Sequence, residues 1–140
     1  SYARAYGILV AQCVRDHWNQ PLDAVTWTPL SRQRRRERGY DQAKLLAKWT
    51  ARELELPLLG MLDKVRDIPP QSDIQEDAKR RANVLGAYRL RKDAKPEGMN
   101  LLLVDDVVTS GSTLSECARL LAGGGAKTVV CATLAQARKN

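Results

Sequence analysis

Residues 101–113 read LLLVDDVVTSGST, and this stretch decides the fold. Leu101 to Val104 form an uninterrupted apolar run, which predicts a strand that is covered on both faces. Asp105 and Asp106 end the run, and five small residues follow at 109–113. A helix is predicted next, because apolar residues recur there at helical spacing, namely Leu114, Cys117, Ala118 and Leu121. Thr113 and Glu116 also have the spacing of a capping box.

Three glycines at 123–125 end that helix, and residues 128–134 predict another buried strand. A strand, a helix and a strand in this order form a βαβ unit. The predicted class is therefore α/β, with a mainly parallel sheet flanked by helices.

The rest of the chain fits this class. The spacing of apolar residues and the positions of proline and other turn-forming residues predict the remaining elements. Helices are predicted over 4–18, 42–54 and 76–83, and strands over 23–28, 58–66 and 87–90. A loop is predicted over 67–75. Asp41 is the expected N-cap of the second helix. Predicted buried faces are Tyr6, Leu9, Val10, Cys13 and Val14 in the first helix, and Ala43, Leu46, Ala47 and Trp49 in the second. Trp18 and Trp27 are expected to pack in the core, and His17 to be structural.

Length and composition indicate one globular domain over residues 1–140. The chain is 44% hydrophobic and 28% charged, and no apolar run approaches the ~18 residues of a membrane span. No secretory signal is visible. Cys13, Cys117 and Cys131 are too widely spaced for a zinc site, and their apolar neighbours predict core positions. We therefore expect a cytoplasmic protein.

The charge indicates an anionic partner. Lys and Arg number 23 against 16 Asp and Glu, which gives +7 at pH 7. Phosphate esters, pyrophosphate, nucleic acid and an anionic membrane all suit this charge.

The candidate site lies where the strand at 101–104 ends. Ligands of open α/β sheets bind beyond the carboxyl ends of the strands. Small residues that lead into a helix N-terminus suit a phosphate, and Asp105 and Asp106 suit sugar hydroxyls or Mg²⁺ held by a polyphosphate. A P-loop lysine is missing from 101–125, and Gly111 alone is no dinucleotide motif. The plainer alternative is an acidic strand end with a Ser/Thr-rich cap.

Residues 101–113 resemble the signature of type I phosphoribosyltransferases, which binds phosphoribosyl pyrophosphate (PRPP). The resemblance implies that Asp105 and Asp106 contact the ribose hydroxyls. It implies that the 5′-phosphate is held by Thr109, Ser110, Gly111, Ser112 and Thr113. It also implies that pyrophosphate is held after the strand at 23–28, by Thr28, Pro29, Leu30, Ser31 and Arg32.

A narrower resemblance, over residues 23–135, is to the ComF family of competence-associated and GntX-like proteins. It rests on PLSR at 29–32, RRERGYDQA at 35–43, PQ at 70–71, RRANV at 80–84 and GAY at 86–88. The chain departs from the family pattern at Asp41, where Asn is common, and at 26–29, where Val-Pro-Val-Pro is common. The N-terminal zinc ribbon of relatives is absent from this sequence.

Residues 31–40 contain five arginines and no aliphatic side chain. Arg34, Arg35, Arg36 and Arg38 are interpreted as a clamp for pyrophosphate or a nucleic-acid backbone, because guanidinium groups bond phosphate in two places. A solvated basic loop is the alternative. Lys79, Arg80 and Arg81 form a second cluster of the same kind.

The resemblance implies a protein that binds PRPP or a related ribose phosphate with Mg²⁺, with no direct metal ligands in the chain. As an enzyme it would be a phosphoribosyltransferase, that is, a glycosyltransferase with PRPP as donor and an open acceptor. One alternative is a non-catalytic DNA-binding module for competence, with single-stranded DNA as the partner. Another is a PRPP-sensing regulator. A homodimer is also compatible with the resemblance.

Overall fold

The computed structural model describes residues 2–30, 41–66, 79, 82, 84–108 and 111–136. Its helices are α1 (Tyr2–His17), α3 (Gln42–Leu54) and α5 (Ser112–Gly123). Its strands are β1 (Ala24–Trp27), β2 (Leu62–Lys64), β3 (Tyr88–Leu90), β4 (Asn100–Val108) and β5 (Thr128–Gln136). The loop predicted at 67–75 and most of the helix predicted at 76–83 lie outside the described residues.

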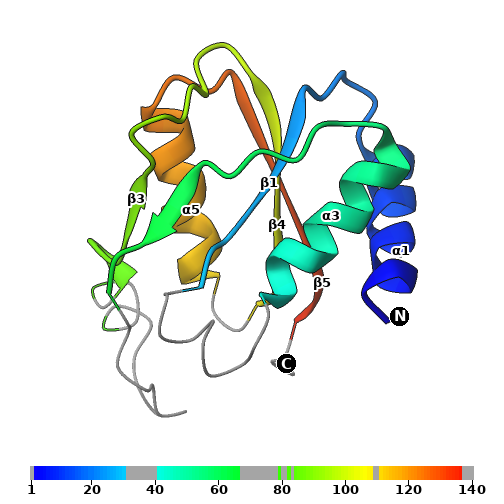
Figure 1. Cartoon of the computed structure of the whole chain (residues 1–140), viewed down its shortest axis with the longest axis horizontal. Helices are drawn as coiled ribbons and strands as arrows, with labels where there is room; N and C mark the ends of the chain where they lie inside the picture. Colours follow the sequence, from blue (N-terminus) through cyan, green and yellow to red (C-terminus); the bar gives the residue numbers. More distant parts are fainter. Residues whose placement is uncertain are drawn as a thin grey trace.

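The central sheet is parallel and has the order β1-β4-β5 (Figure 1). In its register, Ala24 pairs with Leu101 and Leu101 pairs with Val129. A second, antiparallel sheet consists of β2 and β3. The α/β class with a mainly parallel sheet is therefore confirmed. The predicted strand over 58–66 is shorter than expected, with β2 at its centre and an isolated bridge from Leu58 to Val25.

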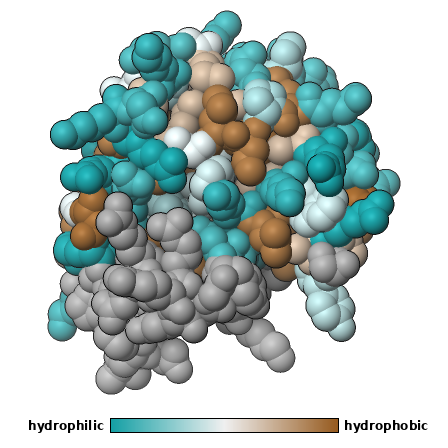
Figure 2. Space-filling model, viewed as in Figure 1, coloured by the Kyte–Doolittle hydropathy of each residue, from teal (hydrophilic) through white to brown (hydrophobic). Residues whose placement is uncertain are grey.

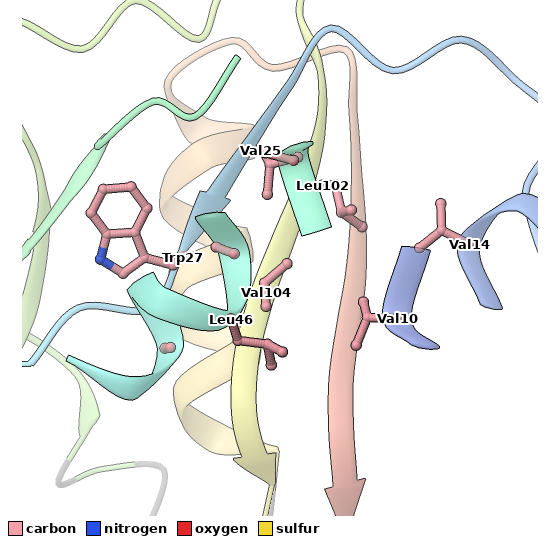
Figure 3. Close-up of a cluster of buried hydrophobic side chains, with 10 residues drawn as sticks. Val10, Val14, Val25, Trp27, Leu46, Leu102 and Val104 are labelled. Carbon is pink, nitrogen blue, oxygen red and sulfur yellow. The ribbon is translucent and has the colours of Figure 1, made fainter. Parts of the chain in front are cut away.

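Two hydrophobic clusters cover the two faces of the sheet. On one face, alternate residues of β1 and β4 pack against α1 and α3, including Val25, Trp27, Leu102 and Val104 (Figure 3). On the other face, Leu101 and Leu103 pack with α5 and β3. All four side chains of Leu101 to Val104 are fully buried, as predicted for a strand covered on both faces.

Small residues make the contact between α1 and α3. The buried residues of α1 are Gly7, Val10, Ala11 and Val14. A Cβ on Gly7 would lie 2.5 Å from the Cβ of Trp49, so glycine permits this close approach. The prediction that Tyr6, Leu9 and Cys13 are buried is wrong. Those side chains are exposed, because the helix turns its small residues rather than its largest ones toward α3.

The prediction of core cysteines holds for Cys117 alone. Cys117 is buried, whereas Cys131 on the outermost strand of the central sheet is exposed like Cys13. Trp27 is buried as predicted, but Trp18 and Trp49 are half-buried. Along the described residues, no helix has the length and apolar character needed to cross a membrane.

Candidate functional site at the ends of β1 and β4

The candidate site begins where β1 and β4 end side by side. Trp27 pairs with Val104, and the next backbone N–H, that of Thr28, donates to the Val104 carbonyl at 3.1 Å. This register brings Thr28 next to Asp105. Both residues are buried, with exposed fractions of 4% and 8%.

Asp105 accepts hydrogen bonds from its neighbours on both sides. The Thr28 hydroxyl donates to its carboxylate, and the backbone N–H of Asp106 donates to Oδ1 at 2.9 Å. Burial disfavours the charged carboxylate and raises the pKa of Asp105 to about 7, although the Thr28 hydroxyl acts in the opposite direction. Asp105 is thus a carboxyl group that changes charge near neutral pH.

Asp106 is half-buried, and its carboxyl group is hydrogen-bonded to that of Asp105. The nearby Asp106 carboxyl group adds to the rise in the pKa of Asp105, because a second carboxylate disfavours the charged form. Two neighbouring carboxylates can accept hydrogen bonds from vicinal hydroxyl groups.

The N-terminus of α5 follows directly after β4. Its N-cap is Gly111, whose φ of 81° lies in the left-handed region that favours glycine. As a glycine it has no side chain with which to cap the helix, and a Cβ on Gly111 would meet nothing within 4 Å. The start of a helix attracts anions through its dipole and its backbone N–H groups, so the segment that follows Gly111 is suited to a phosphate. Thr109 and Ser110 lie outside the described residues.

The predicted capping box at Thr113 and Glu116 is wrong. Ser112 already lies inside the helix, and Glu116 accepts hydrogen bonds from Arg119 at 2.7 and 2.9 Å instead. Those bonds lower the pKa of the buried Glu116 carboxyl. Because Arg119 engages the Glu116 carboxylate one turn further along α5, this carboxylate does not form the reciprocal bond of a capping box.

Tyr88 connects the two parts of the site, and no sequence pattern indicates this contact beyond the need of a buried phenol for a partner. Its side chain comes from β3, is 5% exposed and is hydrogen-bonded to the side chain of Thr113. Burial raises the pKa of the Tyr88 phenol, and the nearby charge of Asp105 adds to the effect. Tyr88 therefore lies between the acid pair and the first turn of α5.

The predicted pyrophosphate segment is described in part. Thr28 and Pro29 are buried, Leu30 is half-buried, and Ser31 and Arg32 lie outside the described residues. The Thr28 hydroxyl is directed to Asp105. The predicted basic loop, with Arg34, Arg35, Arg36 and Arg38, also lies outside the described residues.

The acid pair offers oxygen ligands of the kind that Mg²⁺ binds. Carboxylate oxygens suit this ion. However, no group of three or more His, Cys, Asp or Glu side chains that could hold a metal gathers among the residues with described positions. The expectation of a Mg²⁺ ion that is held mainly by the phosphate oxygens of a ligand stays a prediction.

Comparisons with known proteins agree with this architecture. A family model described as the phosphoribosyl transferase domain matches residues 41–140. Competence protein F of Haemophilus influenzae is 33% identical over 138 residues, which cover 96% of this chain and 59% of that protein. Competence protein ComFC of Bacillus subtilis is 36% identical over 108 residues, with coverage of 76% and 41%.

DNA utilization protein YhgH of Salmonella typhi is 34% identical over 117 residues, with coverage of 80% and 50%. The chain thus spans about half the length of the curated relatives it matches. Among solved structures, glutamine PRPP amidotransferase from B. subtilis superposes with a TM-score of 0.62 at 22% identity. That match covers 92% of this chain and 25% of the other, and shows a shared fold.

Proposed function

The chain belongs to the phosphoribosyl transferase domain family, with ComF-type competence proteins among its relatives, and on this premise we propose that it binds PRPP or a related ribose phosphate together with Mg²⁺. One observation carries the proposal. The acid pair Asp105 and Asp106 and the helix N-terminus that begins at Gly111 lie at the same edge of the sheet.

Each part of the ligand has a matching group in the chain. Asp105 and Asp106 accept hydrogen bonds from the two ribose hydroxyls, and the N–H groups that begin α5 donate to the 5′-phosphate. The dipole of α5 favours the negative charge of that phosphate. Thr28 holds the Asp105 carboxylate in place, and Tyr88 does the same for the Thr113 side chain.

Phosphoribosyl transfer is the proposed reaction, with an acceptor that the chain does not identify. Bound Mg²⁺ would supply positive charge to the pyrophosphate leaving group. The chain itself would contribute orientation, because fixing the ribose and its phosphate holds C1 in position for the acceptor. Arg34, Arg35, Arg36 and Arg38 would add positive charge near the departing pyrophosphate.

A second candidate function is DNA handling without catalysis. The names of the relatives, competence protein and DNA utilization protein, favour it. In this case the start of α5 would receive a phosphate of a DNA strand. A regulator that senses PRPP would use the same contacts as the first candidate.

Thermal unfolding with Mg²⁺ and PRPP separates these candidates. A ligand at 100 times its Kd adds about 2.7 kcal/mol to the unfolding free energy. The transferase and the sensor predict an increase in melting temperature, whereas the DNA module predicts none. Release of pyrophosphate in the presence of a panel of acceptors then distinguishes the transferase from the sensor.

A further inference from the structure

One side of α1 carries apolar side chains that the domain leaves exposed. Tyr2, Tyr6 and Leu9 have exposed fractions of 83%, 39% and 57%, and Cys13 is exposed as well. These four residues, which we call the α1 stripe, follow one another at intervals of four, three and four positions, so they lie along one side of the helix. The rings of Tyr2 and Tyr6 are stacked, with their centres 6.4 Å apart. The α1 stripe has the spacing of a buried helix face, yet the described part of the domain does not cover it.

The α1 stripe points away from the rest of the domain. Gly7 contacts α3, and Val10 and Val14 pack over the sheet (Figure 3). Each residue turns an α-helix by about 100°, so the middle of the α1 stripe lies about 120° around the helix from the middle of this buried face. Figure 1 accordingly shows α1 at the margin of the domain. The stripe is therefore open to a partner that approaches from outside.

The charges of α1 leave the α1 stripe free of cations, although the chain carries a net charge of +7. The two arginines of the helix face α3, since Arg4 lies over the Trp49 ring and Arg15 donates a hydrogen bond to an α3 carbonyl. The one acidic residue of α1 is Asp16, which is exposed in the last turn. A carboxylate there opposes the dipole of its own helix, and it would be stabilised beside the N-terminus of another helix.

The spacing of the α1 stripe suits a second copy of the same helix. Intervals of four, three and four read the same in both directions. An antiparallel copy of α1 can therefore place Tyr2 of one protomer opposite Cys13 of its partner, and Tyr6 opposite Leu9. In this register, Asp16 of each protomer lies beside the N-terminal end of its partner's α1, where the helix dipole favours a negative charge. Shape and charge are thus both self-complementary.

The area of this contact is that of a weak dimer. A fully covered aromatic side chain buries about 150–250 Å², so the exposed parts of Tyr2 and Tyr6 offer roughly 200 Å² on each protomer. Leu9 and Cys13 add to this area. Interfaces below about 1,200 Å² in total are typical of transient complexes, for which a micromolar or weaker Kd is expected. The face seen in Figure 2 is less suited to a second copy, because hydrophilic side chains cover most of it and hydrophobic ones lie near its middle.

We propose that a second copy of this chain binds to the α1 stripe, with the two α1 helices antiparallel about a twofold axis between Tyr6 and Leu9. The contact is isologous, because each protomer offers and receives the same side chains. The family resemblance leaves the surface of a homodimer open, and the α1 stripe defines one. The stripe shares no residue with the candidate site, so the dimer and PRPP binding can each fail without the other.

The first test removes the middle of the α1 stripe. Sedimentation equilibrium over a wide range of protein concentrations measures the mass of the parent protein and of the double variant Tyr6→Ser, Leu9→Ser. The matched control is Val65→Ser, Leu85→Ser, because these two side chains lie outside α1 and have similar exposed fractions, 46% and 56%. All four side chains are exposed, so both variants should fold.

The parent protein and the matched control should become dimeric as the concentration rises. The double variant in the stripe should have a Kd for dimerisation that is at least about tenfold higher, because its apolar contact area is lost from both protomers. A parent protein that stays monomeric at every concentration would overturn the proposal, and so would equal losses in the two variants. A monomer that instead binds phosphatidylcholine vesicles through the stripe would show that lipid is the occupant, and would also overturn it.

The second test measures the register. In a Cys131→Ser background, Tyr2→Cys introduces a thiol that the antiparallel pairing places opposite Cys13 of the partner, while Cys117 is buried. Within one helix the two thiols are about 16 Å apart, so a short bismaleimide should join two protomers rather than one chain to itself. Ile8→Cys is the control, since Ile8 is 37% exposed but lines the hollow beside α3. Equal cross-linking in the two variants, or none in a dimeric Tyr2→Cys protein, would contradict the antiparallel pairing.

Discussion

Replacing Asp105 by asparagine should stabilise the protein at alkaline pH. Asparagine keeps an oxygen that can accept hydrogen bonds from the Thr28 hydroxyl and from the Asp106 N–H. It carries no charge, so it avoids the cost of a buried carboxylate beside a second one. The same change removes a proposed ribose ligand and should weaken PRPP binding.

The size of the effect follows from the pKa. Burial raises the pKa of Asp105 to about 7 in the folded protein, and an unfolded aspartate titrates near 3.9. Each pKa unit corresponds to about 1.36 kcal/mol, so the ionised carboxylate costs up to roughly 4 kcal/mol. The folded state holds the proton longer than the unfolded state. The contribution of Asp105 to stability is therefore greatest below about pH 4, falls between about pH 4 and 7, and stays low above that range.

Urea unfolding at pH 4 and pH 8 measures this effect. Asp105→Asn should unfold like the parent protein at pH 4 and should be more stable by as much as about 4 kcal/mol at pH 8. Asp93→Asn, at an exposed turn position, is the matched control for the loss of one negative charge. If the parent and the Asp105→Asn protein lose stability in parallel as the pH rises, ionisation of Asp105 does not cause the loss of unfolding free energy.

Three further predictions concern packing, positioning and specificity. Gly7→Ala places a Cβ 2.5 Å from the Cβ of Trp49. This change should lower the unfolding free energy by about 1–3 kcal/mol. An unchanged urea midpoint would show that α1 and α3 are not in close contact. Tyr88→Phe removes the hydroxyl that is hydrogen-bonded to Thr113. Calorimetry should show that it weakens binding of ribose 5-phosphate more than binding of pyrophosphate. Equal changes for both ligands would exclude a role of Tyr88 in positioning Thr113. Hypoxanthine and guanine should be poor acceptors, because Thr109 stands where the purine-specific enzymes of the resembled family have an acid, and a hydroxyl is too weakly acidic to act as a base; robust release of pyrophosphate with either base would refute this.

The sequence predicted the central part of the fold because local and tertiary signals agree there. The apolar run at 101–104 and the apolar period after it specified β4 and α5. The N-cap was also predicted correctly, since Asp41 accepts a hydrogen bond from the Lys44 N–H at 3.1 Å and the helix it begins ends at Leu54 as expected. The ComF resemblance, drawn from short motifs, is confirmed by the relatives.

The errors arise where small residues or distant contacts decide the packing. Periodicity alone assigned Tyr6 and Leu9 to the core. The close approach of α1 to α3 at Gly7 instead turns a different face of α1 toward α3. Glu116 has capping-box spacing, but its carboxylate accepts hydrogen bonds from the Arg119 guanidinium instead. The bond between Tyr88 and Thr113 joins residues 25 positions apart on separate elements, and no local pattern encodes it.

Calorimetric titration of Mg²⁺-PRPP into the protein and into the double variant Asp105→Asn, Asp106→Asn tests the central claim most directly. The account predicts saturable binding by the parent protein and a loss of at least about tenfold in affinity in the double variant, because two hydrogen bonds from ribose hydroxyls to charged acceptors contribute about 1.5–3 kcal/mol each. The double variant should remain folded, since neither carboxylate is engaged by a cation among the described residues. Equal PRPP affinity in the two proteins, or no binding by either, would contradict the account.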